Sequence, residues 1–316
     1  MGVGFGATIF RVAEGDGGQR LDKLLRRRFP AVPLSHIFQT LRKGDARING
    51  VRAKGEARVQ DGDEISVRLP TKDSCDPALG QVPEAPSFRG RIPILWEDDD
   101  LLVLNKPAGL AVHPGTGVNP GRTVIEMVQA AFPGAGFPPA LAHRLDKGTS
   151  GVLVLAKTRQ MLVRIQDEIR AHRTGKTYLA LAEGRPRAKS GTIDARLARI
   201  DSARGGAKAI LAEEESGREA HTRWKVVRQL PRHAYLEVAI DTGRMHQIRA
   251  HLASIGLPLV ADERYHPDAS HDALGLKRPF LHAARFEVHL GGRLWAFDAP
   301  LPEDLSQALS RAEALC

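Results

Sequence analysis

One interruption of the sequence most constrains how this chain can fold. Residues 71–90, TKDSCDPALGQVPEAPSFRG, show no sustained hydrophobic periodicity, and together with Pro70 they hold four prolines. Such a stretch predicts an extended tether instead of a helix or a strand. The chain has 316 residues, enough for about two folding units. We therefore predict an N-terminal segment (1–18), a small unit (19–70), the tether (71–90) and a larger unit (91–316).

Two helices are predicted at the start of the small unit. In QRLDKLLRRRFP (19–30), apolar residues at helical spacing form one stripe. The stripe consists of Leu21, Leu24, Leu25 and Phe29. In the second helix we expect Leu34, Phe38 and Leu41 to be buried. Ser35 is the expected N-cap of this helix, and Gly44 is its expected end.

The rest of the small unit has strand patterns. In ARINGVRAK (46–54), Asn49-Gly50 lies between two short alternating segments, which is typical of a tight hairpin turn. DGDEISV (61–67) predicts a turn followed by a strand. The small unit is therefore predicted to be α+β.

Positive charge is concentrated in this unit. From Arg20 to Arg68 there are twelve Lys or Arg and six Asp or Glu, an excess of six positive charges. The whole chain has an excess of nine, so this unit holds two thirds of it. A single run of arginines is usually only a solvated helix face. Two adjacent cationic helices favour a surface that binds phosphate groups. The candidate RNA-binding side chains are Arg20, Lys23, Arg26, Arg27, Arg42 and Lys43.

The motifs of the small unit resemble a known domain over its whole length. The pattern RLDKLL, then LSHIFQTLRKGDARINGVRAK, then VQDGDEISV is similar to the S4 RNA-binding domain. This resemblance, more than the charge count, implies that the anionic partner is RNA.

The larger unit mixes strands and helices without regular alternation. Predicted strands lie in 92–109, 152–156, 176–184 and 233–241, and predicted helices in 124–132 (capped by Thr123), 160–172, 243–256 and 302–315. Such irregular order favours an α+β fold with a mixed, largely antiparallel sheet.

The sequence HRLDKGTSG (143–151) is the most unusual stretch of the larger unit. It places Asp146 between Arg144 and Lys147, immediately before the apolar run 152–156. An isolated aspartate between two cations is normally a solvated ion pair of little energetic worth. At the edge of a buried strand that opens onto a cleft, the same carboxylate can do chemistry.

Five stretches together resemble one enzyme family. They are LNKPAGLAVHPG (104–115), AHRLDKGTSGVLVLAKT (142–158), KTYLAL (176–181), GRMHQIRAHLASIGLPLVAD (243–262) and LHAARFEVH (281–289). In this order, from about residue 92 to the C-terminus, they are similar to the RluA-type pseudouridine synthases. With the S4-like unit in front, the likeness is to enzymes that modify large-subunit ribosomal RNA. The resemblance implies the pseudouridine synthase fold, isomerisation of uridine to pseudouridine, and no cofactor.

The resemblance also implies roles for single residues. Asp146 matches the catalytic aspartate, as nucleophile or as base for a ribose proton, and Arg249 matches the arginine paired with it. Tyr178 matches the tyrosine that stacks on the target base, and Ile248 an aliphatic residue of the pocket. Arg144 is expected to fill the gap left by the flipped nucleotide. The other expected substrate-binding residues are His143, Asn105 and Lys106. Lys147-Gly148 departs from many relatives, which leaves the substrate preference open.

Two other functions remain as alternatives. One is a non-catalytic RNA-binding assembly factor, against which the intact set Asp146, Tyr178 and Arg249 argues. The other is a metal-dependent hydrolase, but no HExxH motif occurs, and His246 and His251 are too far apart in sequence to share a helix face well. The two cysteines, Cys75 and Cys316, support neither a disulfide framework nor a zinc site. We predict no bound metal.

Composition bears on the location of the protein and on the charge of its partner. No secretory signal and no stretch of about 20 apolar residues is present, so a cytoplasmic protein without a membrane span is expected. A sequence pI near 9.8 agrees with an anionic partner. The resemblance to enzymes that modify ribosomal RNA implies that the partner is large-subunit ribosomal RNA or an assembling ribosomal particle, and we expect a monomer.

Overall fold

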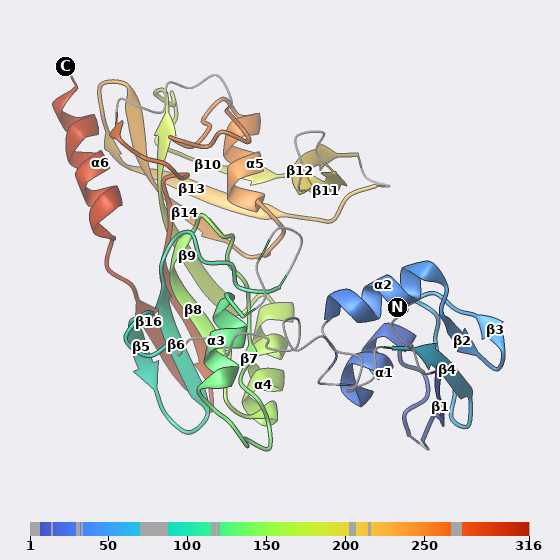
Figure 1. Ribbon diagram of the computed structural model, residues 1–316. Helices are drawn as coiled ribbons and strands as arrows, with labels where there is room; N and C mark the ends of the chain where they lie inside the picture. The colour runs from blue at the N-terminus through green and yellow to red at the C-terminus, as the bar shows by residue number, and fades with distance from the viewer. Residues whose placement is uncertain are drawn as a thin grey trace. The chain divides into compact units, whose positions relative to one another are not determined.

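The chain forms two compact units in the computed structural model. They are the N-terminal unit, Met1–Glu84, and the C-terminal unit, Ala85–Cys316. The structure describes residues 7–13, 15–29, 32, 34–69, 88–114, 118, 121–201, 207–213, 216–266 and 274–315 (Figure 1). Residues 71–87 of the predicted tether lie outside this part of the chain.

The N-terminal unit packs two helices on a four-stranded sheet. Its elements are β1 (Ala7–Arg11), α1 (Leu21–Arg28), α2 (Leu34–Lys43), β2 (Ala46–Ile48), β3 (Val51–Arg52) and β4 (Glu64–Arg68). The sheet has the order β1-β4-β2-β3 with antiparallel pairing. Asn49 (φ 50°) and Gly50 (φ 80°) both adopt the left-handed conformation that a two-residue primed turn requires, which confirms the hairpin. Strand β1 lies within residues 1–18, the segment predicted to precede the small unit. The sequence did not predict this strand, because its alternating pattern is short and its partner β4 is distant in sequence.

The buried face of α2 differs from the predicted one. Ile37 is fully buried and Leu41 nearly so, whereas Phe38 is 40% exposed. Residues four apart lie one above the other on a helix, so the inward row is Ile37–Leu41, and Phe38 lies about 100° away. The expectation that Phe38 is buried was therefore wrong. The helix starts at Leu34, so Ser35 lies inside it and is not its N-cap.

The C-terminal unit is built on one large sheet. The strands are β5 (Ile94–Glu97), β6 (Leu101–Lys106), β7 (Ala140–Leu141), β8 (Ser150–Ala156), β9 (Thr174–Glu183), β10 (Ser190–Asp194), β11 (Arg196–Asp201), β12 (Ala207–Ala212), β13 (His221–Gln229), β14 (His233–Ile240), β15 (Leu281–Leu290) and β16 (Arg293–Asp298). The main path is β10-β13-β14-β9-β15-β8-β6-β5, with β16 on β15, β7 on β8, and β11–β12 as a separate hairpin. All pairs are antiparallel except β15 with β8, which confirms a mixed, largely antiparallel sheet.

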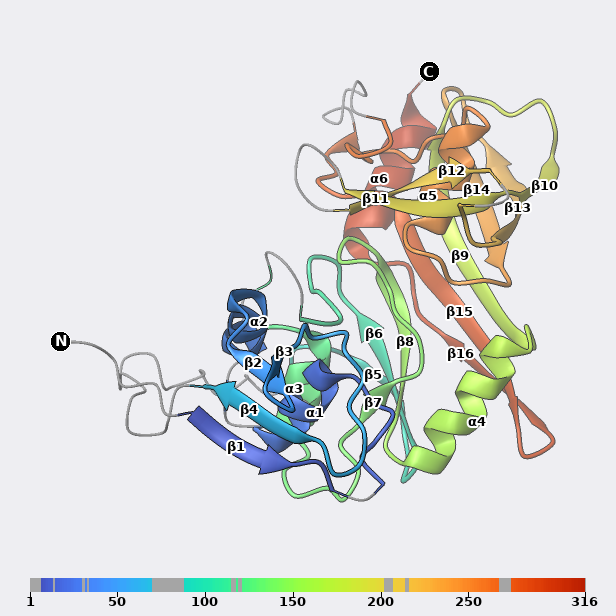
Figure 2. The same ribbon diagram turned by 90° about the vertical axis from the view of Figure 1, so that its right-hand side faces the viewer.

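Helices cover both faces of this sheet (Figure 2). They are α3 (Val124–Ala130), α4 (Arg159–Arg170), α5 (Gln247–Ser254) and α6 (Glu303–Ala314). Alternate residues of β6 and β8 enter two different cores: Leu153 packs in the cluster that contains Val128 of α3, and Val154 in the cluster that contains Ile165 of α4. Because both faces are covered, β8 is buried along its whole length and has no polar alternation.

One glycine fixes how the Asp146 loop enters the sheet. Gly151, at the start of β8, has φ +115°, and a Cβ atom there would lie 2.1 Å from the carbonyl oxygen of Ala283 in β15. Only glycine permits both this conformation and this close backbone approach. The loop before β8 is thereby held against β15.

Candidate active site

The loop that carries Asp146 is anchored from several sides. The Thr149 amide donates to the Asp146 carbonyl at 3.1 Å, and the Gly109 amide to the Lys147 carbonyl at 2.8 Å. The fully buried Lys106 donates from Nζ to the carbonyls of Pro107 (2.8 Å), Leu110 (2.9 Å) and Lys147 (3.3 Å). Lys106 thus joins the loop after β6 to the loop of Asp146.

A second anchored turn precedes α5. The side chain of Gln247, the first residue of α5, accepts from Thr242 Oγ1 at 2.8 Å and from the Arg244 amide at 3.0 Å. It also donates to the His221 carbonyl at 2.9 Å. His246, the N-cap, is held in the left-handed conformation at φ 54°. These contacts fix where His246 and Arg249 point.

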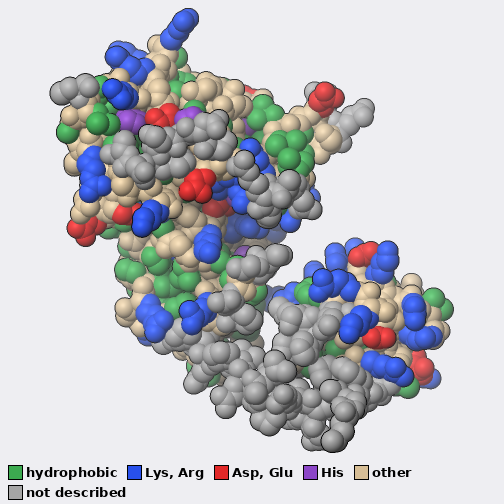
Figure 3. All heavy atoms as spheres, turned by 45° about the horizontal axis from the view of Figure 1, so that its top comes forward, with side chains coloured by type: hydrophobic (Ala, Val, Ile, Leu, Met, Phe, Trp, Pro, Cys, Tyr) green, Lys and Arg blue, Asp and Glu red, His purple; other side chains and the backbone are tan. Residues whose placement is uncertain are grey.

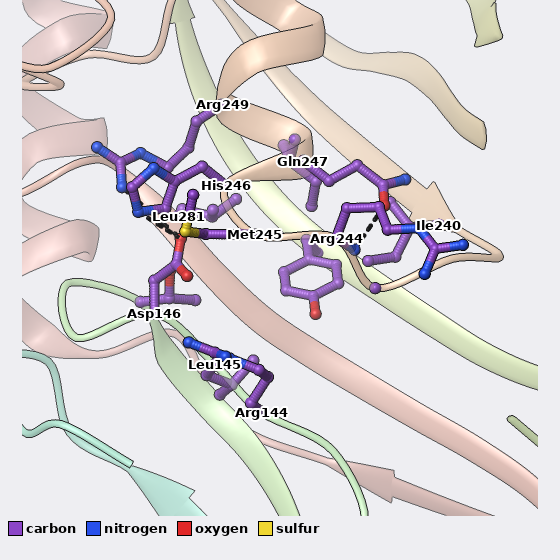
Figure 4. A pocket seen from close by; sticks show the side chains of 14 residues that line it. Arg144, Leu145, Asp146, Ile240, Arg244, Met245, His246, Gln247, Arg249 and Leu281 are labelled. Carbon is purple, nitrogen blue, oxygen red and sulfur yellow. Dashed lines mark hydrogen bonds and ion pairs between the residues drawn. The ribbon is translucent and has the colours of Figure 1, made fainter. Parts of the chain in front are cut away.

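The two anchored segments meet at a pocket lined by 14 residues (Figure 4). The Asp146 carboxylate is turned toward Arg249 and His246, with Oδ2 3.6 Å from Arg249 Nη1 and 3.9 Å from His246 Nε2. Its side chain is 20% exposed. Neither contact is short enough for a hydrogen bond, and no group in the described part of the chain donates one to this carboxylate. Asp146 therefore faces a positive charge while neither of its oxygens accepts a hydrogen bond from the described residues.

Arg249 is the pocket cation that Asp146 faces. Burial alone would lower its pKa, but the hydrogen bonds and charge of Asp262, and the charge of Asp146, raise the pKa of Arg249 above its ordinary value. Burial lowers the pKa of His246 to about 4, despite the nearby Asp146, so this imidazole is neutral at pH 7. The predicted partnership of Arg249 with Asp146 is a charge contact only. The hydrogen-bonded partner of Arg249 is Asp262, which sequence reasoning missed although the quoted motif ends there.

Tyr178 and Ile248 form the apolar part of the pocket. Tyr178 lies in β9, opposite Val238 of β14 and Ala283 of β15, and is 8% exposed. Burial, reinforced by the negative charge of Asp146, raises the pKa of Tyr178, so its phenol stays protonated and can donate but not act as a base at neutral pH. Ile248 is 4% exposed, and the exposed Arg144 also lines the pocket.

Three of the predicted substrate-binding residues do not line this pocket. His143 accepts the Val154 amide at 3.1 Å and stacks on Phe286, and burial lowers its pKa to about 3. Asn105 lies within β6, opposite Val152. Lys106 is committed to three carbonyls, and burial lowers its pKa to about 7, although Asp146 partly opposes this. All three lie in the fold around the Asp146 loop and not in the pocket.

The predicted RNA-binding side chains of the N-terminal unit are all exposed. They are Arg20, Lys23, Arg26, Arg27, Arg42 and Lys43. On the face of this unit drawn in Figure 3, Lys and Arg side chains outnumber Asp and Glu. A groove beside them, lined by Arg20, Arg42, Lys54 and the exposed Phe38, was not predicted, because it depends on the rotation of α2. Two of the cations also contact acidic neighbours: Arg20 pairs with Asp22, and Arg27 with Asp16.

The described residues include neither a metal-binding cluster nor a membrane-spanning helix. They contain no group of three or more His, Cys, Asp or Glu side chains that could hold a metal ion. Among the described helices, none has the length and apolar character needed to cross a membrane.

Comparisons with known proteins agree with this geometry. Residues 100–254 match the model of the RNA pseudouridylate synthase family, and residues 19–65 match the S4 domain. The chain is 36% identical to ribosomal large subunit pseudouridine synthase C of Escherichia coli (strain K12) over 318 residues, covering 96% of each. It is 35% identical to the protein of that name from Haemophilus influenzae, covering 96% of this chain and 94% of the relative.

Solved structures show the same relationship. Human RNA pseudouridylate synthase domain containing 4 matches 69% of this chain and 92% of its own, with a TM-score of 0.57 and 26% identity. Human RNA pseudouridylate synthase domain containing 1 matches 67% and 84%, with a TM-score of 0.55 and 25% identity. The motifs around Asp146, the fold of the C-terminal unit and these matches agree: the chain belongs to the RNA pseudouridylate synthase family and carries an S4 domain at its N-terminus.

Proposed function

We propose that this protein isomerises specific uridines to pseudouridine in large-subunit ribosomal RNA, with Asp146 as its catalytic carboxylate. The observation that carries the proposal is the position of that carboxylate. It lies in a pocket with Tyr178 and Ile248, faces Arg249 at 3.6 Å, and receives no hydrogen bond from the described residues. The names of the bacterial relatives supply the choice of large-subunit RNA.

The reaction needs little beyond such a site. The C1′–N1 glycosidic bond of uridine breaks, uracil turns, carbon 5 bonds to C1′, and the hydrogen of carbon 5 leaves as a proton while nitrogen 1 gains one. No net oxidation occurs and no co-substrate is consumed. Asp146 either adds to C1′ and later leaves, or removes a proton from the ribose. Both routes need an ionised carboxylate with an accessible oxygen.

The other pocket residues have supporting roles in this proposal. The Tyr178 ring stacks on the flipped uracil, and its protonated hydroxyl donates to the substrate. Arg249 places a positive charge 3.6 Å from the Asp146 carboxylate. Ile248 excludes water from one side of the base. Arg144, which is exposed at the pocket, occupies the space that the flipped nucleotide leaves.

The N-terminal unit contributes affinity. Its exposed cations contact phosphates, and Phe38 offers a ring against which an unpaired base can stack. We propose that the enzyme acts as a monomer in the cytoplasm, on free ribosomal RNA or on an assembling large-subunit particle.

The test uses unmodified transcripts of large- and small-subunit ribosomal RNA, and assembling particles from cells that lack the protein. After incubation with the purified protein, pseudouridine is mapped chemically. We expect modification at discrete uridines of the large-subunit RNA, on the transcript or on the particle. The Asp146→Asn variant should give none, while Asp99→Asn, at an exposed aspartate that does not line the pocket, should act as wild type. Absence of modification on every substrate would contradict the proposal and favour an RNA-binding assembly factor.

A further inference from the structure

The guanidinium of Arg249 is shared unequally between two aspartates. Its Nε donates to Asp262 Oδ2 at 2.8 Å and its Nη2 to Asp262 Oδ1 at 2.7 Å. Only Nη1 faces Asp146, at 3.6 Å. Two of the three nitrogens of the fork are therefore bound to Asp262 in the bidentate geometry that arginine prefers.

Asp262 is itself held rigidly. Its side chain is fully buried, and its Oδ1 also accepts from the amides of Arg264 (3.3 Å) and Tyr265 (3.4 Å). The Tyr265 ring lies against the guanidinium, with its centroid 5.1 Å from Arg249 Cζ. The Tyr265 hydroxyl is fixed in turn on the backbone of Ala209, to which it donates at 2.9 Å and from which it accepts at 2.9 Å. The guanidinium of Arg249 is thus held in its plane by Asp262 and on one face by the Tyr265 ring.

The contacts with Asp262 determine the geometry between the Arg249 guanidinium and the Asp146 carboxylate. A guanidinium without another partner would form the bidentate pair with the nearest carboxylate, and both oxygens of Asp146 would then be engaged. Because Asp262 already holds two nitrogens, Asp146 receives the positive charge without a hydrogen bond. Its oxygens stay available to the ribose.

We propose that Asp262 is a positioning residue for the isomerisation: it holds Arg249 so that the charge faces Asp146 while the oxygens of Asp146 remain free to react. This inference rests on the proposed catalytic role of Asp146 and extends it to the residue that sets the geometry. Asp262 acts only through Arg249, and it does not line the pocket.

The test is a double-mutant cycle on the full chain. Single-turnover rates at saturating RNA, RNA dissociation constants and melting curves are measured for Asp262→Asn, Arg249→Gln and the double variant. Asp262→Asn should lower the rate about tenfold or more, with the dissociation constant within about threefold of wild type. If Asp262 works through Arg249, the double variant should be no slower than Arg249→Gln alone.

A matched control distinguishes the positioning role of Asp262 from a general effect of losing a bidentate arginine–carboxylate pair. Glu168 holds Arg173 through the same two nitrogens, Nε at 3.0 Å and Nη2 at 2.6 Å, outside the pocket, so Glu168→Gln should leave the rate unchanged. A wild-type rate for Asp262→Asn, or losses that multiply in the double variant, would overturn the proposal. If Asp262→Asn does not fold, Arg249→Lys replaces it: one ammonium cannot serve both aspartates, so a rate within about threefold of wild type would overturn the proposal.

Failure of this inference can be distinguished from failure of the proposed function. If wild type isomerises uridine and Asp146→Asn does not, the proposed function stands whatever Asp262→Asn does. If wild type is inactive on every RNA, the proposed function fails first.

Discussion

The helices of the N-terminal unit and Arg249 of the C-terminal unit present positive charge in opposite ways. In the N-terminal unit, Arg26, Arg42 and Lys43 lie exposed on helices. In the C-terminal unit, the Arg249 side chain is 11% exposed and is bound to a carboxylate that is fully buried. An exposed cation interacts weakly with any one partner and remains mobile, which suits contacts to many phosphates. A buried guanidinium in one fixed orientation suits one reaction. The comparison predicts that RNA affinity and turnover can be lost separately.

The largest effect on turnover, apart from loss of Asp146, is expected at the base platform. Tyr178→Ala removes the ring, and we expect the single-turnover rate to fall about 10- to 100-fold, because stacking on one base is worth about 1–3 kcal/mol. Tyr178→Phe keeps the ring and should stay within about tenfold of wild type. Both are measured at saturating RNA. A wild-type rate for Tyr178→Ala would show that the pocket does not hold the base as proposed.

The next largest effect is expected on RNA affinity, which we assign to the N-terminal unit. Replacing Arg26, Arg27, Arg42 and Lys43 with Gln removes four exposed cations from α1 and α2. We expect RNA affinity to fall about 10- to 100-fold and the salt dependence of binding to become shallower, since fewer counterions are released. The single-turnover rate at saturating RNA should not change.

The control for this variant has the same change of charge. Replacing Arg11, Arg47, Arg52 and Arg68 with Gln alters four exposed cations on the strands of the same unit. Filter-binding titrations at several salt concentrations compare the two sets. Equal losses of affinity would mean that net charge, not the helical surface, binds RNA.

The smallest effect concerns stability and pH. The pKa of His143 in the folded protein is about 3, below the ordinary 6.5, so the unfolded chain binds a proton that the folded chain does not. Stability from this group is complete above about pH 6.5 and decreases as the pH falls toward 3. His143→Gln should therefore lower the melting temperature at pH 7.5. Between pH 7.5 and pH 5, the melting temperature of the variant should then decrease less than that of wild type.

His289, which is exposed in β15, provides the comparison. His289→Gln should keep the wild-type decrease in melting temperature over the same interval. If His143→Gln kept it as well, His143 would not be the neutral buried acceptor that the structure describes.

The sequence predicted much of the fold, and its failures have physical causes. The leucine stripe of α1, the Asn49-Gly50 turn and the cap at Thr123 depend on local geometry, and the structure has all three. Strand β1 and the buried face of α2 depend on partners that are distant in sequence. Phe38 illustrates this: helical spacing predicted it on the inner face with Leu34 and Leu41, whereas in the folded unit Ile37 lies in the core with Leu41.

The candidate site shows the same limit. The motifs predicted that Asp146, Tyr178 and Arg249 belong to one site, and the structure places all three at one pocket. The motifs could not distinguish residues that line the pocket from those that build it, such as His143 and Lys106. Nor could they assign Asp262, because hydrogen bonding between side chains of different segments is a property of the folded chain.

In the proposed function, Asp146 performs the chemistry while other residues hold the RNA. The direct test is single-turnover release of tritium from uridine labelled at carbon 5 in RNA, beside a filter-binding titration, for wild type and Asp146→Asn. Asparagine keeps the shape but removes the charge, and Arg249 keeps Asp262 as its partner, so the melting temperature should change by no more than about 4 °C. We expect no detectable release by the variant, with the dissociation constant within about threefold of wild type. Release within about tenfold of the wild-type rate would show that Asp146 is not the catalytic carboxylate.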